Sequence, residues 1–401
     1  MKIVHLIGYF QPEFGYKEYY IARNQAKKGH EVHVVTSDRV FPFPDYSRLA
    51  KEIGVSASRA REVGESEIDG ILVHRQKTIF ELKEFILIKG VKKLLKKINP
   101  DIVHAYAPNQ GSTALGALHK KELGYFLIGD DQVFTKDGKP TPYSSIKGMI
   151  RYNLFQSSLS QFYFNRCDVI FCPNAASKDY IGEKFGVKDK TEVVPIGFDP
   201  DFYHFDQKSR ETIRKKYGVG EAETAVLLVG RLTPDKGFDR VIKLSEDIPK
   251  KSKAKILIVG DGSFKKELEN QVRSLVVSDK VFFAGFVPER DLYQYYSAAD
   301  IGVWPKRPSV GISNATGCEL PILVPNDAMM NHLVGRGNGL AFEPSSERDL
   351  FDKLNLMITS RDSITMRMRK NAKKFAGDTL SYEKLALRDI EAYEQYKRLL
   401  K

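Results

Sequence analysis

The sequence predicts an α/β fold of two Rossmann-like halves, each with a mostly parallel sheet covered by helices on both faces. Short β-branched runs alternate with amphipathic stretches, and this alternation occurs in two separate series along the chain. Because neighbouring parallel strands need helical crossovers, the alternation favours parallel sheets. The length of 401 residues suits about two to three domains of ordinary size.

The first series extends over residues 1–195, which we predict to form one domain. Its strand-like runs are KIVHLI, EVHVVT, GILVHR, DIVHAY, YFLIGD and DVIFCP. The stretches Tyr16 to Lys28 and Ile79 to Ile98 are amphipathic and predict crossover helices between these strands.

The second series occupies residues 196–380, which we predict to form the other domain. Its strand-like runs are AVLLVGR, KILIVGDG, KVFFAGF, DIGVWP and PILVPN, with helices predicted from Lys236, Phe264 and Glu289. The segment VVPIGF to GEAE, rich in proline, glycine and charge, predicts an interdomain connection with a boundary near Pro195. Residues 381–401 predict a terminal helix that packs back on the first domain.

The charge favours anionic partners. The chain has 63 Lys and Arg against 51 Asp and Glu, a formal net charge of +12, which suits nucleotides or phospholipid headgroups. We expect no nucleic-acid partner, because the basic residues are spread along the chain without a basic arm or an aromatic RNA-binding signature. No run approaches the ~18 apolar residues of a membrane span, and no signal-peptide pattern opens the chain, so we expect a cytoplasmic protein.

Metal and disulfide chemistry is not predicted. Cys167, Cys172 and Cys318 lack the spacing of a disulfide framework or a zinc site and are interpreted as reduced structural thiols. Asp199-Pro200-Asp201 spells an Asp-x-Asp sequence, but Pro200 restricts Asp199 to extended geometry and no third oxygen ligand lies nearby in sequence. We therefore expect no metal site.

The motif VGRLTPDKGF predicts an anion site. It puts Gly230, Arg231 and Lys236 directly after a strand, with Lys236 near the start of a helix. Two cations beside a helix N-terminus favour a diphosphate, since the peptide dipoles and the fixed charges act together. Solvated Arg and Lys in an ordinary strand-turn-helix are the alternative. Ligands of open parallel sheets bind outside the carboxyl ends of the strands, so we expect the site in a cleft between the halves.

A second glycine-rich turn follows the next strand, in IVGDGSFKKELE. Gly260, Asp261 and Gly262 lie there, and glycine permits a sharp turn and close approach of the backbone to a ligand. The turn is not a GxGxxG fingerprint, so it does not indicate a nicotinamide enzyme.

The order and spacing of these motifs resemble the donor half of the large retaining glycosyltransferase family with the GT-B fold, the family-four type or glycosyl transferases group 1. VGRLTPDKGF, IVGDGSFKKEL and VFFAGFVPERDLYQYYSAADIGVWP carry the resemblance, which FGYKEYYIARNQAKKGHEVHVVT, PDIVHAY and VVPIGFDPDFY extend to the first half. It covers nearly the whole chain. It implies two Rossmann-like domains facing across a cleft, the first for the acceptor and the second for a nucleotide-diphosphate sugar.

The resemblance implies a retaining, metal-independent hexosyltransferase that needs no cofactor, with a UDP-sugar favoured over a GDP-sugar as substrate. Arg231 and Lys236 would grip the donor diphosphate and stabilise the leaving group. The glycine-rich turns, with Gly230, Gly260, Asp261 and Gly262, would lie at the donor. The loop GYFQPEFGYKE implies acceptor contacts from Gly15, Tyr16 and Lys17, although Tyr16 stands where relatives often have a second glycine.

The chain departs from the family at its paired glutamates. Aligning the closing LPIL puts Lys306 and Asn314 at the two positions, or Ser309 at the first if the loop is shorter. Asn314 could hydrogen-bond a ribose hydroxyl. Glu319, where the family has a small residue, is either a helix-end charge or a site residue. The backbone of the helix start could approach the diphosphate through Gly311, Ile312 and Ser313.

Polar residues also end two strands of the first series. Asp130, in YFLIGDDQVF, matches a position where relatives often carry a histidine beside the reacting sugar. A carboxylate there could hydrogen-bond a sugar hydroxyl or stabilise cationic character at the anomeric carbon, or Asp130 or Asp131 could cap the turn. His104 is predicted either to contact the acceptor or to be a satisfied strand-end residue. The histidines interpreted as structural are His5, His30, His33 and His74.

The stretch FELKEFILIKGVKKLLKKI is basic and amphipathic. It is either an interfacial helix drawn to anionic lipid or an ordinary crossover helix with a solvated lysine face. The lysines that lie beside its Leu and Ile residues are Lys89, Lys92, Lys93, Lys96 and Lys97.

We therefore predict a glycosyltransferase of glycan biosynthesis that acts on a glycan or lipid-linked acceptor, peripheral at the inner face of the cell membrane if the lysine-rich segment binds lipid. The missing glutamates keep two alternatives open: a catalytically weak GT-B protein that binds a partner transferase or glycan, and a sugar-nucleotide epimerase. The sequence does not identify the base, the sugar, the acceptor or the oligomeric state.

Overall fold

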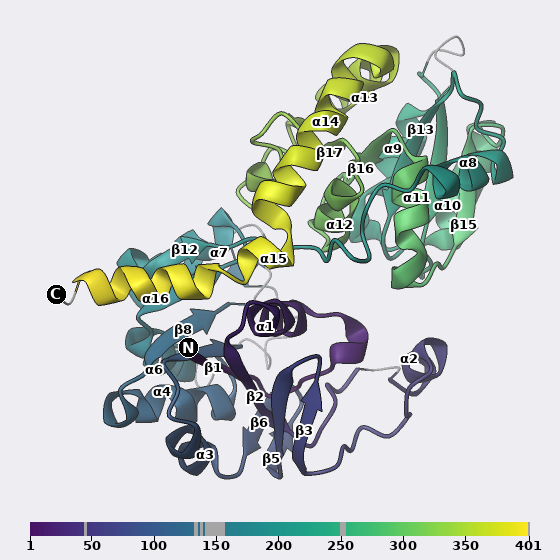
Figure 1. The fold of residues 1–401 in the computed structure, drawn as a ribbon. Helices are drawn as coiled ribbons and strands as arrows, with labels where there is room; N and C mark the ends of the chain where they lie inside the picture. The colour runs from purple at the N-terminus through teal and green to yellow at the C-terminus, as the bar shows by residue number, and fades with distance from the viewer. Residues whose placement is uncertain (44–45, 132–134, 137–138, 141–156, 249–253, 400–401) are drawn as a thin grey trace. The chain divides into compact units, whose positions relative to one another are not determined.

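The computed structural model describes residues 1–43, 46–131, 135–136, 139–140, 157–248 and 254–399 (Figure 1). The chain divides into two compact units: unit 1 comprises Met1–Pro195 and Leu385–Lys401, and unit 2 comprises Ile196–Lys384. No helix in the described ranges is both long enough and apolar enough to cross a membrane.

Unit 1 is built on an eight-stranded sheet, parallel throughout except for the pair β3 and β4. Across the sheet, the strands are β12 (Thr191–Val193), β11 (Val169–Cys172), β8 (Phe126–Asp130), β7 (Ile102–Tyr106), β1 (Lys2–Leu6), β2 (Glu31–Ser37), β4 (Ile71–Gln76) and β3 (Gly64–Ile68). The strand order reverses between β1 and β7, and open α/β sheets bind ligands beyond the carboxyl ends of the strands at such a point.

Helices cover both faces of this sheet, as the sequence predicted. On one face, α3 (Val91–Ile98), α4 (Gly111–Leu123) and α6 (Ser157–Arg166) join a core of apolar strand residues. On the other face, α1 (Lys17–Lys27) packs against β2 and β4, and α16 (Arg388–Leu399) lies against β7. The remaining elements of unit 1 are η1 (Pro12–Phe14), α2 (Tyr46–Ile53), β9 (Thr135–Lys136), β10 (Lys139–Pro140), α7 (Ala175–Phe185) and η3 (Lys188–Lys190).

The prediction of one helix over Ile79 to Ile98 is wrong in its first half. A hairpin of β5 (Thr78–Leu82) and β6 (Phe85–Ile88) precedes α3. The run TIFELKEFILI is rich in β-branched and aromatic residues, which favour strands, and Lys83 takes a left-handed φ of 55° in the turn.

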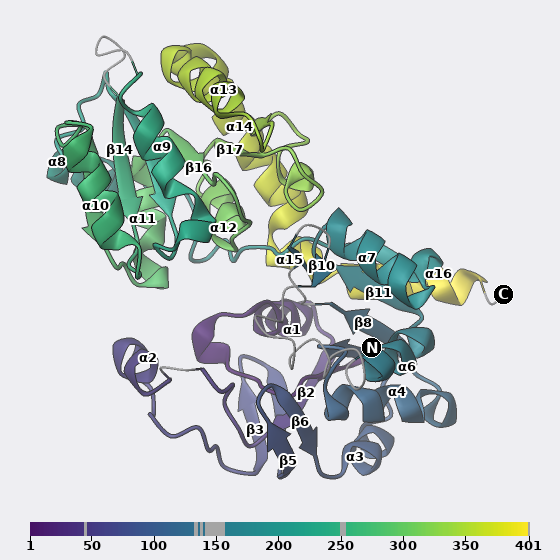
Figure 2. The ribbon, with the colours of Figure 1, turned by 180° about the vertical axis from the view of Figure 1, so that it is seen from behind.

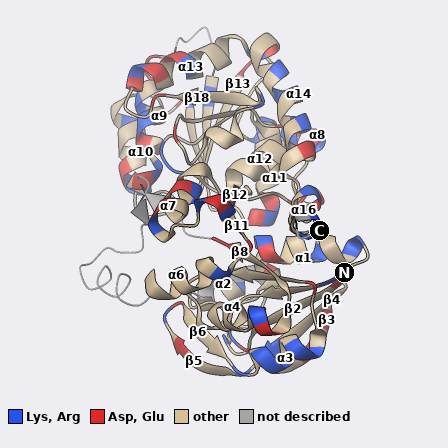
Figure 3. Ribbon diagram, turned by 90° about the vertical axis from the view of Figure 1, so that its left-hand side faces the viewer, with Lys and Arg blue, Asp and Glu red and all other residues tan. Residues whose placement is uncertain are grey.

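The helix α3 is an ordinary crossover helix. Its apolar residues Val91, Leu94, Leu95 and Ile98 are buried in the core of unit 1. Figure 3 shows that basic residues make up much of its remaining surface. Because its apolar side is covered, α3 cannot lie in a membrane as an interfacial helix does.

Unit 2 is built on a six-stranded parallel sheet with the strand order of a Rossmann fold. Across the sheet, the strands are β15 (Val281–Gly285), β14 (Ala254–Val259), β13 (Thr224–Val229), β16 (Ile301–Val303), β17 (Ile322–Pro325) and β18 (Gly339–Phe342). Here the order reverses between β13 and β16, so the loops after these two strands are where a ligand is expected.

Two apolar clusters flank the sheet of unit 2. One contains residues of α9 (Phe238–Leu244), α10 (Lys265–Ser274) and α13 (Glu347–Thr359), and Figure 2 shows α9 and α10 side by side. The other contains residues of α8 (Gln207–Lys216), α11 (Leu292–Ala298) and α12 (Gly311–Gly317). The remaining elements are η4 (Pro234–Lys236), η6 (Glu289–Asp291), η7 (Asn331–Leu333), η8 (Arg361–Thr365), α14 (Met366–Phe375), η9 (Ala376–Leu380) and α15 (Tyr382–Leu385).

The segment predicted as a plain interdomain connection contains the helix α8. Asp206 caps this helix, since its Oδ1 accepts a hydrogen bond from the Ser209 amide at 2.6 Å. Arg210 and Arg214 on α8 pair with the two oxygens of Asp300 at 2.6 and 2.9 Å. Ion pairs as well as apolar contacts dock α8, which explains its weak apolar periodicity. The predicted terminal helix is also interrupted, because α15 and α16 are separate.

Candidate active site

In unit 2, the loops after β13 and β16 lie against each other at the point where the strand order reverses. Lys236 Nζ donates to the Pro308 carbonyl at 3.5 Å, and Lys306 Nζ donates to the Pro234 carbonyl at 3.4 Å. Gly237 allows this approach: it has a φ of 73°, and a Cβ there would lie 2.8 Å from Lys306 Cγ. Each loop thus contributes a lysine whose ammonium group binds a backbone carbonyl of the other loop.

The loops are strongly basic. Their one carboxylate, Asp235, lies 3.7 Å from Arg307. Burial lowers the pKa of the Lys236 ammonium; Asp235 opposes this, and Arg231 and Arg307 lower the pKa further. The four cations of the loops are Arg231, Lys236, Lys306 and Arg307. An anion bound here would relieve their mutual repulsion, so the cluster suits phosphate groups.

The glycines of the two predicted turns serve the contact between neighbouring loops. A Cβ on Gly260 would lie 1.9 Å from the Gly230 carbonyl oxygen, and one on Gly262 would lie 2.4 Å from the Leu232 carbonyl oxygen. The Leu232 amide donates to the Asp261 carbonyl at 2.9 Å. Approach to a ligand was the predicted reason for these glycines. In the structure, the backbone of Gly230 and Leu232 occupies the space that a Cβ at either glycine would need.

The helix α12 follows the basic loop. The Gly311 amide donates to Ser309 Oγ at 3.3 Å, and Ser313 Oγ donates to the Ile196 carbonyl at 2.6 Å, while Ile312 packs in the core. The side chain of Asn314 is buried and makes no hydrogen bond with the residues that the structure describes. Among the predicted donor residues of α12, Asn314 therefore offers a side chain that can still bind a ligand.

The structure gives Glu319 the helix-end role. It follows the last turn of α12 with a left-handed φ of 61°, and its carboxylate accepts a hydrogen bond from Lys373 Nζ at 2.8 Å. Since α12 rises about 1.5 Å per residue, Glu319 lies well away from the helix start, which favours the helix-end alternative over a donor contact.

In unit 1, Asp130 lies at the carboxyl end of β8 and is completely buried. Its Oδ2 accepts hydrogen bonds from Lys17 Nζ at 2.6 Å and from His104 Nε2 at 3.2 Å. Burial opposes ionisation of Asp130, but Lys17 and His104 outweigh it and hold the pKa of the carboxyl below its usual value. Its Oδ1 is buried without a partner among the described residues. Asp130 is thus held as an ionised carboxylate.

His104 is enclosed between two carboxylates. Its Nδ1 lies 2.7 Å from Oδ2 of Asp389, on α16, and its Nε2 faces Asp130. Burial alone would lower the pKa of His104, yet Asp389 and Asp130 outweigh it and raise the pKa to about 9. Because both ring nitrogens have partners, the structure gives His104 the role of a satisfied buried residue and not that of an acceptor contact.

The predicted acceptor loop precedes α1. Gly15 has a left-handed φ of 64°, and a Cβ there would lie 2.7 Å from the Tyr20 hydroxyl oxygen. Tyr16 has an ordinary φ of −77°, and its ring stacks on that of Phe14 at 6.1 Å. A tyrosine at position 16 therefore introduces no backbone strain, whereas Gly15 is required.

Sequence reasoning missed three polar residues of this site. Asp389 binds His104, and Gln25 Nε2 donates to Asp389 Oδ2 at 2.8 Å. Glu18 is buried beside Lys17, and burial raises its pKa to about 7. Gln25 and Glu18 lie on the buried side of α1, where an apolar residue is the usual occupant. No sequence signal connects Asp389 to His104, because the two residues are 285 positions apart.

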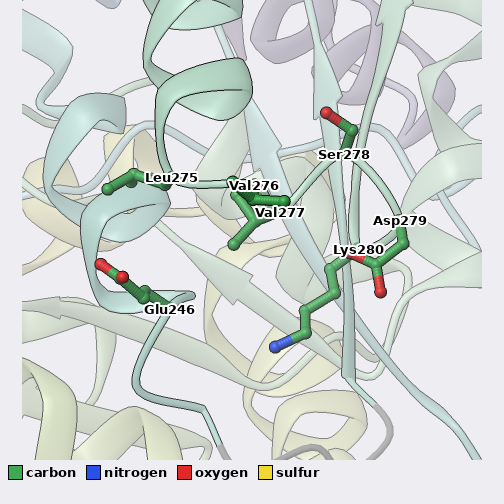
Figure 4. A pocket seen from close by; sticks show the side chains of 7 residues that line it. All are labelled: Glu246, Leu275, Val276, Val277, Ser278, Asp279 and Lys280. Carbon is green, nitrogen blue, oxygen red and sulfur yellow. The ribbon is translucent and has the colours of Figure 1, made fainter.

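Other candidate features have structural roles. The three cysteines are buried and free, as predicted. Asp199 Oδ1 accepts a hydrogen bond from the Asp201 amide at 3.1 Å within a turn. Among the residues that the structure describes, no group of three or more His, Cys, Asp or Glu side chains could hold a metal ion. Figure 4 shows a surface pocket lined by Glu246 and residues 275–280. Residues 275–280 precede β15 and so lie at the amino ends of the strands, whereas the basic loops follow the carboxyl ends of β13 and β16.

Comparison with known families decides the assignment. The model of the family described as "Glycosyl transferases group 1" matches residues 209–375, and that of "Glycosyltransferase Family 4" matches residues 19–202. The chain belongs to the group 1 glycosyltransferases. Its two units have the GT-B fold of that family.

Several proteins to which this chain is similar are glycosyltransferases or glycolipid synthases. The chain is 24% identical over 384 residues to the uncharacterized glycosyltransferase MJ1607 of Methanocaldococcus jannaschii, covering 93% of this chain and 92% of that one. It is 26% identical over 158 residues to the alpha-monoglucosyldiacylglycerol synthase of Streptococcus pneumoniae, covering 38% and 36%. The crystal structure of Anabaena HepE in complex with UDP covers 100% of this chain with a TM-score of 0.68, at 19% identity and 99% coverage of HepE.

Proposed function

We propose that this group 1 glycosyltransferase is a retaining, metal-independent hexosyltransferase that moves a sugar from a nucleotide diphosphate to a glycan or lipid-linked acceptor. The observation that carries the proposal is the cluster of four cations on the loops after β13 and β16. A nucleotide sugar presents two negative charges at its diphosphate, and the switch point of a parallel sheet is where such a ligand binds.

The cations would act on the leaving group. When the glycosidic bond breaks, its electron pair passes to an oxygen of the β-phosphate, and the nucleoside diphosphate gains negative charge. Arg231 and Lys236 would stabilise this charge more in the transition state than in the ground state, which is the condition for a gain in rate. Asp130, held ionised and with no partner for Oδ1 among the described residues, would accept a hydrogen bond from a sugar hydroxyl or stabilise positive charge at the anomeric carbon.

A UDP-sugar is favoured over a GDP-sugar as donor. The UDP complex of HepE supports UDP, while a mycobacterial relative named a GDP-mannose-dependent mannosyltransferase supports GDP, at 28% identity over 173 residues. Asn314 would hydrogen-bond the ribose as a neutral group, and neutral hydrogen bonds contribute about half as much as charged ones.

Replacing Asn314 with alanine should weaken nucleoside diphosphate binding by ~1 kcal/mol, because it removes one neutral hydrogen bond. Isothermal titration with UDP, GDP and ADP measures this and identifies the base. Asn270→Ala, at an exposed position of α10, is the control and should bind like the wild type. An Asn314→Ala variant with unchanged affinity would remove this residue from the donor site.

Transfer should survive EDTA, because lysine and arginine would take the role that a metal ion has elsewhere. Release of UDP from UDP-glucose is measured before and after chelation, then with added magnesium or manganese. Loss on chelation with rescue by either ion would contradict metal independence.

A second candidate is a catalytically weak GT-B protein that binds a partner transferase or a glycan. The observation that favours it is the lack of the paired glutamates, since Lys306 and Asn314 stand at their positions. If the wild type binds no nucleotide at millimolar concentration, this candidate replaces the first. A sugar-nucleotide epimerase, the third candidate, would instead release a free epimerised sugar.

A cytoplasmic protein peripheral to an anionic membrane surface is a further part of the proposal. In the hairpin, Ile79, Phe80 and Leu82 are at least half exposed, and the exposed Lys77 and Lys83 flank them. The relative named alpha-monoglucosyldiacylglycerol synthase supports a lipid-linked acceptor.

Cosedimentation with phosphatidylglycerol vesicles should decrease as salt rises and when the α3 lysines Lys92, Lys93, Lys96 and Lys97 become glutamine. Each lysine near such a surface contributes ~1 kcal/mol. Neutral phosphatidylcholine vesicles are the control. Equal pelleting of wild type and variant would contradict the electrostatic contribution of α3.

A further inference from the structure

A buried chain of polar side chains connects the carboxylate of Asp130 to the C-terminal helix of unit 1. Lys17 and His104 hold Asp130 Oδ2, and the other nitrogen of His104 faces Asp389 at 2.7 Å. Asp389 Oδ2 also accepts a hydrogen bond from Gln25 Nε2 at 2.8 Å. These residues come from α1, β7, β8 and α16, so four segments distant in the sequence build one network.

The network continues to β1, and most of its side chains are buried. His5 Nε2 lies 2.7 Å from Gln25 Oε1, and His5 Nδ1 lies 2.9 Å from the Tyr106 hydroxyl. His5, Gln25, His104, Asp130 and Asp389 are each at most 1% exposed. Burial removes the water that would otherwise solvate these charges, so each group depends on its partners for its orientation and its charge.

His104 differs from His5 because of Asp389. Burial and the nearby His104 together lower the pKa of His5 to about 4. His104 is equally buried, yet Asp389 and Asp130 raise its pKa to about 9. At neutral pH, His104 is therefore an imidazolium that donates a hydrogen bond to each carboxylate, and Asp389 supplies part of the charge that keeps it protonated.

Lys17 and His104 hold Asp130 through its Oδ2. With Oδ2 fixed by Lys17 and His104, Oδ1 is buried and has no partner among the residues that the structure describes. An unpaired carboxylate oxygen is costly unless a ligand completes it. This arrangement suits a carboxylate oriented to accept a hydrogen bond from a sugar hydroxyl.

We propose that Asp389, supplied by the C-terminal helix α16, is a positioning residue of the glycosyl-transfer site, acting through His104 to orient Asp130. The proposal rests on the function proposed above. Asp389 contacts no substrate in this scheme. It fixes the imidazolium, the imidazolium fixes Asp130 Oδ2, and Asp130 Oδ1 meets the substrate.

The test is the Asp389→Asn variant in the full chain, which keeps the shape of the side chain and removes its charge. We expect turnover of UDP-glucose, measured as UDP release per folded molecule, to decrease by roughly ten-fold or more, because a misoriented catalytic group loses rate steeply. The Kd for UDP should stay within about two-fold, since the donor cations belong to unit 2. A purely structural role would lower the folded fraction and leave the turnover of the folded molecules unchanged.

A double-mutant comparison makes the test specific. If Asp389 acts through His104, the Asp389→Asn/His104→Gln double variant should be no slower than His104→Gln alone. Glu394→Gln, at an exposed position of α16, is the control and should behave like the wild type. If Asp389→Asn does not fold, Gln25→Met takes its place, because it removes the amide that holds Asp389 and leaves every charge present.

Three results would overturn the proposal. Wild-type turnover in both Asp389→Asn and Gln25→Met would exclude a positioning role for Asp389 while leaving the proposed function intact. Additive losses in the double variant would show that Asp389 does not act through His104. A wild type that binds a nucleoside diphosphate but releases none from a panel of UDP-, GDP- and ADP-sugars would overturn the proposed function and this inference together.

Discussion

Replacing Lys236 with alanine is expected to lower turnover of the nucleotide sugar by about 100-fold or more, as when a preorganised charge-stabilising group is lost from a transition state. Lys236 is half-buried and lies near Arg231 and Arg307. Burial and the neighbouring arginines disfavour the charged form of Lys236 in the free protein, whereas a bound anion would stabilise it. Arg231→Ala should have an effect of the same order.

Steady-state kinetics separate the possible causes. Loss of kcat with a smaller change in KM would show that the cations act mainly on the leaving group, whereas a rise in KM alone would show uniform binding of the donor. Lys243→Ala, an exposed lysine on α9, is the matched control and should keep wild-type rates. Near-wild-type transfer by both Lys236→Ala and Arg231→Ala would disprove the assignment of the donor site.

Replacing Asp300 with asparagine should destabilise unit 2 by about 3–5 kcal/mol, the cost of removing one partner from a buried ion pair. Asp300 holds Arg210 at 2.6 Å and Arg214 at 2.9 Å and accepts a hydrogen bond from the Ala225 amide at 2.8 Å. Without this carboxylate, two guanidinium groups would remain beside the sheet with no counter-charge there, and α8 would lose its attachment.

The pH dependence gives a second measure of Asp300. Burial opposes its ionisation, but Arg210 and Arg214 outweigh it and lower the pKa below the usual 3.8. A carboxyl with a lowered folded pKa contributes stability that is present above its unfolded pKa and is lost as pH falls through the folded value. Urea unfolding should thus show the destabilisation by Asp300→Asn at neutral pH, and the difference from wild type should shrink in acid below about pH 3.8.

The matched control is Asp378→Asn, at an exposed position of unit 2, which should change stability by less than about 0.5 kcal/mol. Unfolding is followed in the full chain, with the two units allowed separate transitions. A loss of less than about 1 kcal/mol for Asp300→Asn would show that the pair adds little beyond the packing of α8.

The α/β class and the repeated strand–helix series could be predicted from local patterns in the sequence. Strands such as AVLLV and KILIV are continuous apolar runs because parallel strands are buried on both faces, and this burial is written in the local pattern. The position of Arg231 and Lys236 directly after β13 was also readable, since both residues follow a strand within one motif.

Which distant groups meet depends on the packing of the whole fold and could not be predicted from local patterns. It showed that Lys306 and Arg307 join Arg231 and Lys236, because β16 lies beside β13 in the sheet although some 70 residues separate them in the chain. The structure also shows the hairpin β5–β6 where part of a helix was predicted. A short apolar run fits both the period of a helix, about 3.6 residues, and the two-residue period of a strand, so the sequence pattern does not distinguish them.

The clearest case is the site around Asp130. The sequence predicted Asp130 as a site residue, and it left His104 either as an acceptor contact or as a satisfied strand-end residue. Nothing in the sequence indicated that Asp389 of the C-terminal helix would pair with that histidine. A single buried polar residue produces no periodic pattern in the sequence from which its partner could be predicted. The partner of His104 follows from the order of the strands and from the packing of α16 against β7. Local patterns specify which faces are buried, whereas the partners of buried charges are specified only once those faces come together.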